Sequence, residues 1–131
     1  LFRISTPVGL VAKLDRAYRL PSGLLVLVEF KTRSSNQPCL SDVIQLSAQR
    51  MAVMGQAGLA VASHAYVMVK TQAGRSLPTA HCVELMSDDQ VIALIRRRDN
   101  LLAGRLLPRR PLSLRTCDTC SFRGRCSGFS H

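Results

Sequence analysis

Two acidic residues and a lysine flank a short turn near the start of the chain. Asp15 lies seven residues before Ser22, and Glu29 lies seven residues after it. Ser22 is the centre of a Leu-Pro-Ser-Gly turn signal at 20–23. A simple antiparallel hairpin therefore places Asp15 and Glu29 opposite each other, with Cβ atoms about 4.5–5.5 Å apart. Two carboxylates in this position repel, and a bound divalent cation would make the same pair favourable.

Lys31 extends this acidic pair. It follows Glu29 by two residues, so its side chain leaves the same face of the strand about 7 Å further along. Val28 and Phe30 are expected to point to the opposite face, into the core. Carboxylate oxygens suit Mg²⁺ or Mn²⁺, and a lysine can orient a metal-bound water or accept its proton. The triplet favours metal-dependent attack on a phosphate, and a surface hairpin with ordinary ion pairs is the alternative.

A helix is predicted over 40–56, after a polar loop at 33–38. Its apolar stripe consists of Leu40, Val43, Ile44, Met51 and Met54. Ser41 or Asp42 can cap its start. Gln45 and Gln49 lie one turn apart on this helix. A neutral amide at Gln45 can hold a phosphate oxygen or an attacking water without competing for the metal, and an ordinary polar helix face is the alternative.

The remaining pattern predicts an α/β or α+β domain around a mixed sheet. Leu24–Lys31 is the strongest strand and forms a hairpin with a strand-like run at Gly9–Tyr18. Further strands are expected at Leu1–Ser5, Ala60–Val69 and Cys82–Leu85, and a second helix from Ser87 to about Leu102. We expect a core at 1–104 and a basic, cysteine-rich tail at 105–131.

Positive charge concentrates at the C-terminal end. The chain has 131 residues and a formal net charge of +10, and nine Arg against two Asp in 96–131 supply +7 of it. The arginines assigned to DNA phosphates are Arg97, Arg98, Arg105, Arg109 and Arg110. The alternative is that these arginines form a solvated surface that keeps the protein soluble. No secretory signal and no bilayer-spanning apolar run is evident, so we expect a cytoplasmic protein that is not bound to a membrane, with association with the nucleoid as one option.

The chain has five cysteines. An odd number of cysteines in a chain without an evident secretory signal argues against a disulfide scaffold. Cys117, Cys120 and Cys126 form a C-x2-C-x5-C pattern, in which a tight turn and a short loop bring three thiolates toward one centre. A Zn²⁺ site or three unliganded thiols are the alternatives. Cys39 and Cys82 are expected to be free thiols.

The ordered set of motifs resembles the PD-(D/E)XK nuclease superfamily, RecB-like branch. Gly9-Leu-Val-Ala-Lys-Leu-Asp15 is similar to its G-x-x-D motif, Val28–Thr32 to (D/E)-x-K, and the helix with Gln45 to Q-x-x-x-Y, with Gln49 in place of the tyrosine. The tail cysteines are similar to those of the iron–sulfur branch, which includes the CRISPR-associated exonucleases.

This resemblance implies a restriction-endonuclease-like mixed sheet flanked by helices and a Mg²⁺- or Mn²⁺-dependent deoxyribonuclease. It would be an exonuclease acting on DNA ends or single strands, with protein partners in DNA processing, repair or defence. Asp15 and Glu29 would hold the metal, Lys31 would act on the attacking water, and Gln45 would correspond to the motif glutamine.

The resemblance also implies that the tail cysteines are three ligands of a 4Fe–4S cluster. The fourth cysteine and the family's usual upstream helix are expected before Leu1. A catalytically inactive DNA-binding module of the same fold, or a small zinc-binding nucleic-acid-binding protein, are the competing functions.

Overall fold

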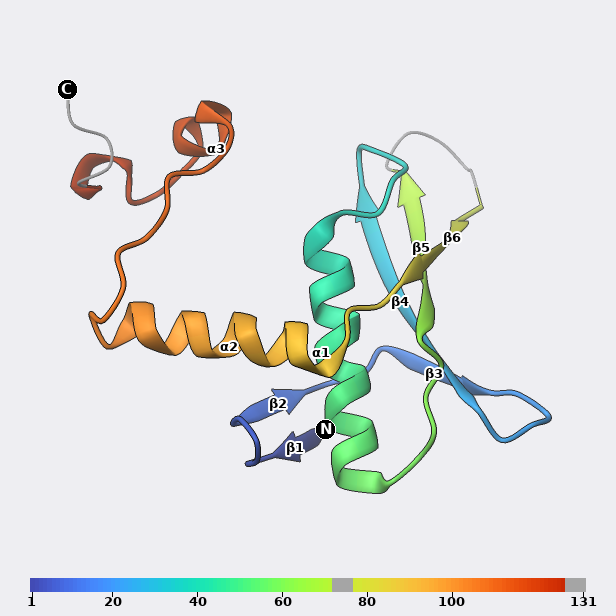
Figure 1. Ribbon diagram of the computed structural model, residues 1–131. Helices are drawn as coiled ribbons and strands as arrows, with labels where there is room; N and C mark the ends of the chain where they lie inside the picture. The colour runs from blue at the N-terminus through green and yellow to red at the C-terminus, as the bar shows by residue number, and fades with distance from the viewer. Residues whose placement is uncertain (72–76, 127–131) are drawn as a thin grey trace. The chain divides into compact units, whose positions relative to one another are not determined.

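The computed structural model describes residues 1–71 and 77–126, apart from the side chain of Leu114 (Figure 1). The elements are β1 (Phe2–Ile4), β2 (Leu10–Ala12), β3 (Arg16–Arg19), β4 (Leu25–Arg33), α1 (Leu40–Ala57), β5 (His64–Thr71), β6 (Thr79–Glu84), α2 (Asp88–Leu102), α3 (Leu114–Asp118) and a 3₁₀ helix at Arg123–Arg125. This order confirms the mixed α and β class predicted from the sequence.

The chain forms two compact units, Leu1–Arg96 and Arg97–His131. The first unit contains both sheets, α1 and the first part of α2, and the second contains the end of α2, α3 and the 3₁₀ helix. Within the described part of the chain, no helix combines the length and the apolar character needed to cross a membrane.

The main sheet is mixed and has the strand order β3-β4-β5-β6. Strands β4 and β5 are parallel, and the chain passes between them through α1, as a parallel pair requires. The other two pairs, β3 with β4 and β5 with β6, are antiparallel. A separate two-stranded sheet of β1 and β2 precedes them.

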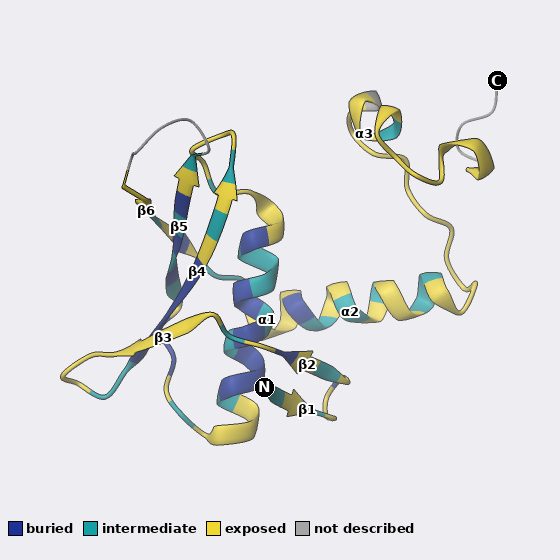
Figure 2. Ribbon diagram, turned by 180° about the vertical axis from the view of Figure 1, so that it is seen from behind, coloured by how far each residue is buried: buried dark blue, intermediate teal, exposed yellow. Residues whose placement is uncertain are grey.

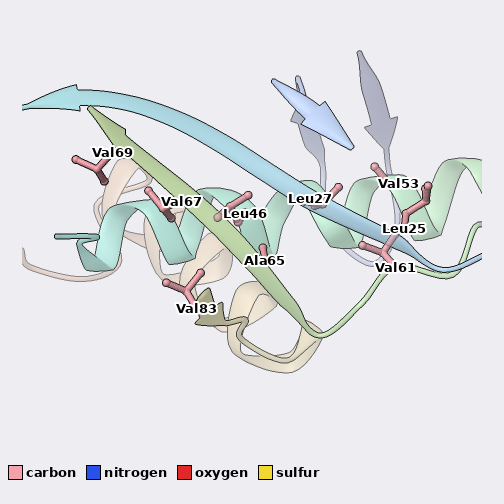
Figure 3. Packing of buried hydrophobic residues seen from close by; sticks show 9 residues of the cluster. All are labelled: Leu25, Leu27, Leu46, Val53, Val61, Ala65, Val67, Val69 and Val83. Carbon is pink, nitrogen blue, oxygen red and sulfur yellow. The ribbon is translucent and has the colours of Figure 1, made fainter. Parts of the chain in front are cut away.

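The core lies between α1 and one face of the main sheet (Figure 3). Ala65, Val67 and Val69 alternate along β5 and are almost completely buried, as period-2 spacing requires for one face of a strand. Leu46 and Val53 of α1 are both fully buried and seven residues apart, so they form one helical stripe. Figure 2 shows the buried positions of α1 along much of its length.

The β3–β4 hairpin has the register that the turn spacing predicts. Arg16 pairs with Val28, and Arg19 pairs with Leu25. Extending this ladder by one position places Asp15, which immediately precedes β3, across from Glu29. The hairpin therefore aligns the two predicted acidic positions.

The single strand expected over Gly9–Tyr18 is wrong, because the structure divides this run in two. Strand β2 pairs with β1 and β3 pairs with β4, while Lys13–Asp15 lies between them. The first half is diverted because Val8 and Leu10 pack in a second apolar cluster with Met51 of α1. The alternation of apolar and polar residues over Gly9–Tyr18 could not predict this contact, because Met51 lies far along the chain.

The expectation that Phe30 enters the core is also wrong. Its side chain is 41% exposed, and the guanidinium of Arg16 lies 5.1 Å from its ring centroid. Val28 is buried as expected. Glu29 points to the other face of β4 and is only 3% exposed, because α1 packs on that face. The acid is thus buried and the aromatic residue exposed.

The N-cap of helix α1 lies two residues before Ser41 and three before Asp42, the two residues expected to cap it. This N-cap is Cys39, and the Asp42 carboxylate at the third helical position accepts a hydrogen bond from the Cys39 backbone N–H at 2.9 Å. The expected Ser41 cap is therefore wrong. Asp42 takes the third position of a capping box, where its carboxylate accepts the hydrogen bond from the backbone N–H of the N-cap residue.

Candidate active site

Strand β4 and helix α1 face each other across the buried acid. Glu29 and Lys31 leave the same face of β4, because they are two residues apart in a regular strand. Gln45 and Gln49 lie one turn apart on α1. Gln45 contacts both Glu29 and Lys31. Gln49 contacts Glu29 and the backbone carbonyl of Lys13. The sheet and the helix therefore assemble a polar site inside an otherwise apolar interface.

The two oxygens of the Glu29 carboxylate have different surroundings. Gln45 Nε2 donates to Oε1 at 2.8 Å, and Lys31 Nζ lies 3.2 Å from the same atom. Gln49 Nε2 approaches Oε2 at 3.5 Å, the long limit for a hydrogen bond. Burial of a carboxylate is unfavourable unless it is paired and hydrogen-bonded, and these contacts supply that pairing. They leave Oε2 the more weakly satisfied oxygen.

Gln45 connects the acid and the lysine. Its Oε1 accepts a hydrogen bond from Lys31 Nζ at 3.1 Å, while its Nε2 donates to Glu29. The reverse orientation would place the amide NH₂ group against an ammonium group that only donates. Glu29, Lys31 and Gln45 thus contact one another through two hydrogen bonds of the Gln45 amide and one ion pair between Lys31 and Glu29.

Asp15 reaches the same place from the other strand. Its Oδ2 accepts a hydrogen bond from the backbone N–H of Phe30 at 3.1 Å. Because Phe30 follows Glu29 directly, this contact holds the Asp15 carboxylate beside β4 at the level of Glu29. Asp15 is exposed and Glu29 is buried, so the pair offers one solvent-facing and one enclosed oxygen donor group.

A second buried carboxylate, Asp42, was not identified as a site residue from the sequence. It is 2% exposed, and Arg33 donates to both of its oxygens, each at 2.9 Å. Lys31 Nζ lies 4.0 Å from Asp42 Oδ1. The spacing of Cys39 and Asp42, which fits a capping box, is the signal that could have located it. Asp42 connects the start of α1 to the end of β4.

The ionisation of this cluster follows from its contacts. Burial raises the pKa of Asp42, but the hydrogen bonds from Arg33 and from the Cys39 backbone outweigh it and bring the pKa to about 2. The same ion pair raises the pKa of Arg33. The hydrogen bond with Ser41 lowers the pKa of the Cys39 thiol, with a further contribution from Arg33 at 3.2 Å. Asp42 is therefore a carboxylate at neutral pH.

Comparison with known families agrees with this arrangement. The family model described as the PD-(D/E)XK nuclease superfamily matches residues 2–127. The chain belongs to the PD-(D/E)XK nuclease superfamily. The sequence-based assignment to this superfamily is thereby confirmed, and the mixed sheet flanked by helices is consistent with a restriction-endonuclease-like fold.

A solved structure supports the fold of this superfamily member independently. The protein described as "Crystal structure of SSO0001" superimposes with a TM-score of 0.52 at 15% sequence identity. The match covers 82% of this chain and 46% of that chain, so the 131 residues correspond to about half of the longer protein. No curated protein matches the sequence.

The tail cysteines of this PD-(D/E)XK superfamily member lie in consecutive tight turns of the second unit. The Cys120 backbone N–H donates to the Cys117 carbonyl at 3.2 Å, and that of Cys126 donates to the Arg123 carbonyl at 3.3 Å. All three thiols are free. No group of three or more His, Cys, Asp or Glu side chains within residues 1–71 and 77–126 is arranged to hold a metal ion. The three thiols are therefore not gathered into one site in this structure.

The arginines predicted to contact DNA also lie in the second unit. Arg98, Arg105, Arg109 and Arg110 are exposed, and Arg97 is half-buried. Arg98 lies 3.3 Å from the carboxylate of Asp99, and Arg105 Nε donates to Asn100 Oδ1 at 2.8 Å. The structure thus gathers Glu29, Lys31 and Gln45 with Asp15 beside them, and places the basic and cysteine residues in the other unit.

Proposed function

We propose that this chain is the nuclease core of a Mg²⁺- or Mn²⁺-dependent enzyme that hydrolyses phosphodiester bonds of DNA. The observation that supports it best is the buried Glu29 carboxylate, held by Lys31 and Gln45 next to Asp15. This arrangement has no evident structural purpose in an apolar interface, where a hydrophobic side chain would serve at least as well. By the resemblance drawn from the sequence, these residues correspond to motif positions of the nuclease superfamily, whose model spans all of them.

The donor set fits a hard divalent cation. Asp15 and Glu29 offer two carboxylates, and Mg²⁺ is commonly held by one or two carboxylates together with waters and substrate phosphate oxygens. Glu29 Oε2 has only a 3.5 Å contact with Gln49, so it is the oxygen best able to serve as a ligand. A bound cation would acidify a water molecule and offset negative charge on the phosphate.

Lys31 is proposed to hold the attacking water. Its ammonium group has three N–H donors; one donates to Gln45 Oε1, and Nζ also forms an ion pair with Glu29 Oε1 at 3.2 Å. A remaining N–H can bind a water or a phosphate oxygen. The side chain is 28% exposed, so substrate can reach it while Gln45 keeps its position fixed.

The finer assignments rest on the resemblance to the RecB-like branch and on charge. We propose exonuclease action on DNA ends or single strands, with protein partners in a DNA-processing complex. The +7 charge of 96–131 provides a sequence-independent attraction for phosphates. Arg97, Arg98, Arg105, Arg109 and Arg110 are the proposed contacts.

For the tail, we propose a 4Fe–4S cluster with Cys117, Cys120 and Cys126 as three ligands and a fourth cysteine from outside the tail. The C-x2-C-x5-C spacing and the tight turn joining Cys117 to Cys120 support it. Anaerobically purified protein that is brown and loses its colour on Cys120→Ala would support the cluster. Colourless protein with stoichiometric zinc would instead support the zinc alternative.

The nuclease proposal is tested with end-labelled single- and double-stranded DNA in the presence of Mg²⁺, Mn²⁺ or EDTA. Glu29→Gln and Asp15→Asn should abolish cleavage but leave DNA binding largely intact. Glu84→Gln is the matched control, because Glu84 is an exposed acid at the end of β6. Equal cleavage in EDTA, or an active Glu29→Gln variant, would refute the assignment. Metal-independent DNA binding without cleavage would favour an inactive DNA-binding module.

A further inference from the structure

Gln49 joins the two segments that carry the proposed metal ligands. It is 3% exposed, and its Nε2 donates to the backbone carbonyl of Lys13 at 2.9 Å. The same nitrogen lies 3.5 Å from Glu29 Oε2. An amide NH₂ group has two N–H donors, so one side chain can serve both partners.

The Lys13 carbonyl lies outside the ladders of the neighbouring strands. Lys13–Asp15 is the break between β2, which pairs with β1, and β3, which pairs with β4. Asp15 follows Lys13 by two residues, and its carboxylate reaches the Phe30 N–H on β4. The Gln49 contact therefore fixes the point from which the Asp15 segment approaches β4.

Gln45 and Gln49 act on different parts of the site. Gln45 contacts Glu29 Oε1 and Lys31 and so belongs to the proposed chemistry around the attacking water. Gln49 contacts Glu29 Oε2, the oxygen available to a cation, and the main chain next to Asp15. The hydrogen bonds of Gln49 in the described structure involve Lys13 and Glu29 and do not include Lys31.

From this geometry we infer that Gln49 is a positioning residue that sets the separation of the Asp15 and Glu29 carboxylates, and thereby the affinity for the divalent cation. The inference rests on the proposed nuclease function and names the residue that tunes its metal site. Without the amide, the Lys13–Asp15 segment keeps the packing of Leu14 against the core but loses its hydrogen bond to α1, and Glu29 Oε2 loses the donor that orients it. The effect falls on metal binding, because the groups that act on water remain in place.

The test uses the 131-residue chain and measures two quantities. Mn²⁺ binding in the absence of DNA is followed by the loss of the free Mn²⁺ signal in electron paramagnetic resonance. The rate of cleavage of labelled DNA is then measured over a range of Mn²⁺ concentrations. Gln49→Met keeps the length and helix propensity of the side chain but removes the donor. Gln49→His is the conservative variant, because a ring N–H can donate to the Lys13 carbonyl.

We expect Gln49→Met to weaken Mn²⁺ binding by about 10- to 100-fold, as the loss of partners that orient metal ligands does. The rate at saturating Mn²⁺ should stay within about fivefold of wild type, because the lost interaction is made before the chemical step. Gln49→His should recover part of the affinity. Gln90→Met is the matched control, because Gln90 accepts a hydrogen bond from the Ser87 backbone at the start of α2. It should lower stability without altering Mn²⁺ affinity.

The outcomes separate this inference from the proposed function. Wild-type Mn²⁺ affinity in a folded Gln49→Met variant, with wild-type protein that binds Mn²⁺ and cuts DNA, overturns the positioning role and leaves the nuclease intact. A lost rate at every Mn²⁺ concentration with unchanged affinity also overturns it. Wild-type protein that neither binds Mn²⁺ nor cuts DNA refutes the proposed function itself. If Gln49→Met does not fold, the Gln49→His variant decides by the same two measurements.

Discussion

The buried ion pair between Asp42 and Arg33 should make the free energy of unfolding decrease as the pH falls below about 4. The pKa of Asp42 is lowered from 3.8 to about 2 by its hydrogen bonds, against the effect of burial. A group with a lowered folded-state pKa contributes stability that is present above its unfolded pKa and is lost as the pH falls. The difference of nearly two pKa units corresponds to about 2 kcal/mol, lost between about pH 4 and pH 2, with about half of it gone by pH 3.

Asp42→Asn removes this contribution. The free energy of unfolding at pH 7 should fall by about 2 kcal/mol, and the gap between wild type and variant should close to about half at pH 3. Urea unfolding followed by circular dichroism, with the thiols kept reduced, gives both values. Asp89→Asn is the control, because it removes an exposed carboxylate from the first turn of α2 and should cost less than about 1 kcal/mol.

The pH dependence of the difference tests the reasoning more strictly than its size. A gap between wild type and Asp42→Asn that stays constant from pH 7 to pH 3 would show that the carboxylate form of Asp42 is not what stabilises the start of α1. Because this helix also presents Gln45 to Lys31, the variant should in addition cut DNA more slowly. An Asp42→Asn variant with full stability and full activity would contradict the structural role proposed for the ion pair between Asp42 and Arg33.

Three further outcomes are expected. Lys31→Met should reduce the maximal cleavage rate by about 10²- to 10⁴-fold while retaining Mn²⁺ binding by paramagnetic resonance; loss of both together would place Lys31 in the fold rather than in the chemistry. DNA affinity should fall steeply with salt, and Arg109→Gln should lower the slope of log affinity against log salt by about one unit; a salt-independent affinity would exclude phosphate contact as its source. Leu46→Ala, at a side chain with 0% exposure, should cost about 2–5 kcal/mol in urea unfolding, whereas an equal cost for exposed Leu40→Ala would show that burial against the sheet is not the cause.

Local features of the sequence predicted a large part of the fold. The turn at 20–23 sets the hairpin register, because the length of a hairpin connection determines which residues face each other. Helices were expected over 40–56 and from Ser87 to about Leu102, and the structure has Leu40–Ala57 and Asp88–Leu102. The boundaries agree within a residue because they follow from the helical periodicity, although the expected Ser41 cap of α1 is wrong.

The sequence predicted which residues belong to the candidate site better than it predicted the contacts that surround them. The structure brings Glu29, Lys31 and Gln45 into direct contact, while their catalytic roles stay predictions. Asp42 was expected only as a cap, and Gln49 only as a polar residue at a motif position. Their contacts with Arg33 and with the Lys13 carbonyl join residues 9 and 36 positions apart, and no local pattern specifies such pairs.

The sequence by itself determined the hairpin register, the helices and the order of the acid, acid and lysine, because each depends on neighbours along the chain. Only the tertiary structure decided which face of β4 packs against α1, because Leu25–Glu29 is buried on both faces. Apolar residues occur on both faces of this strand, so alternation alone could not choose between them. The packing of α1 on the face with Leu27 made the choice. It buried Glu29 among amides and left Phe30 in solvent, because a carboxylate enters a core only where donors are already placed to receive it.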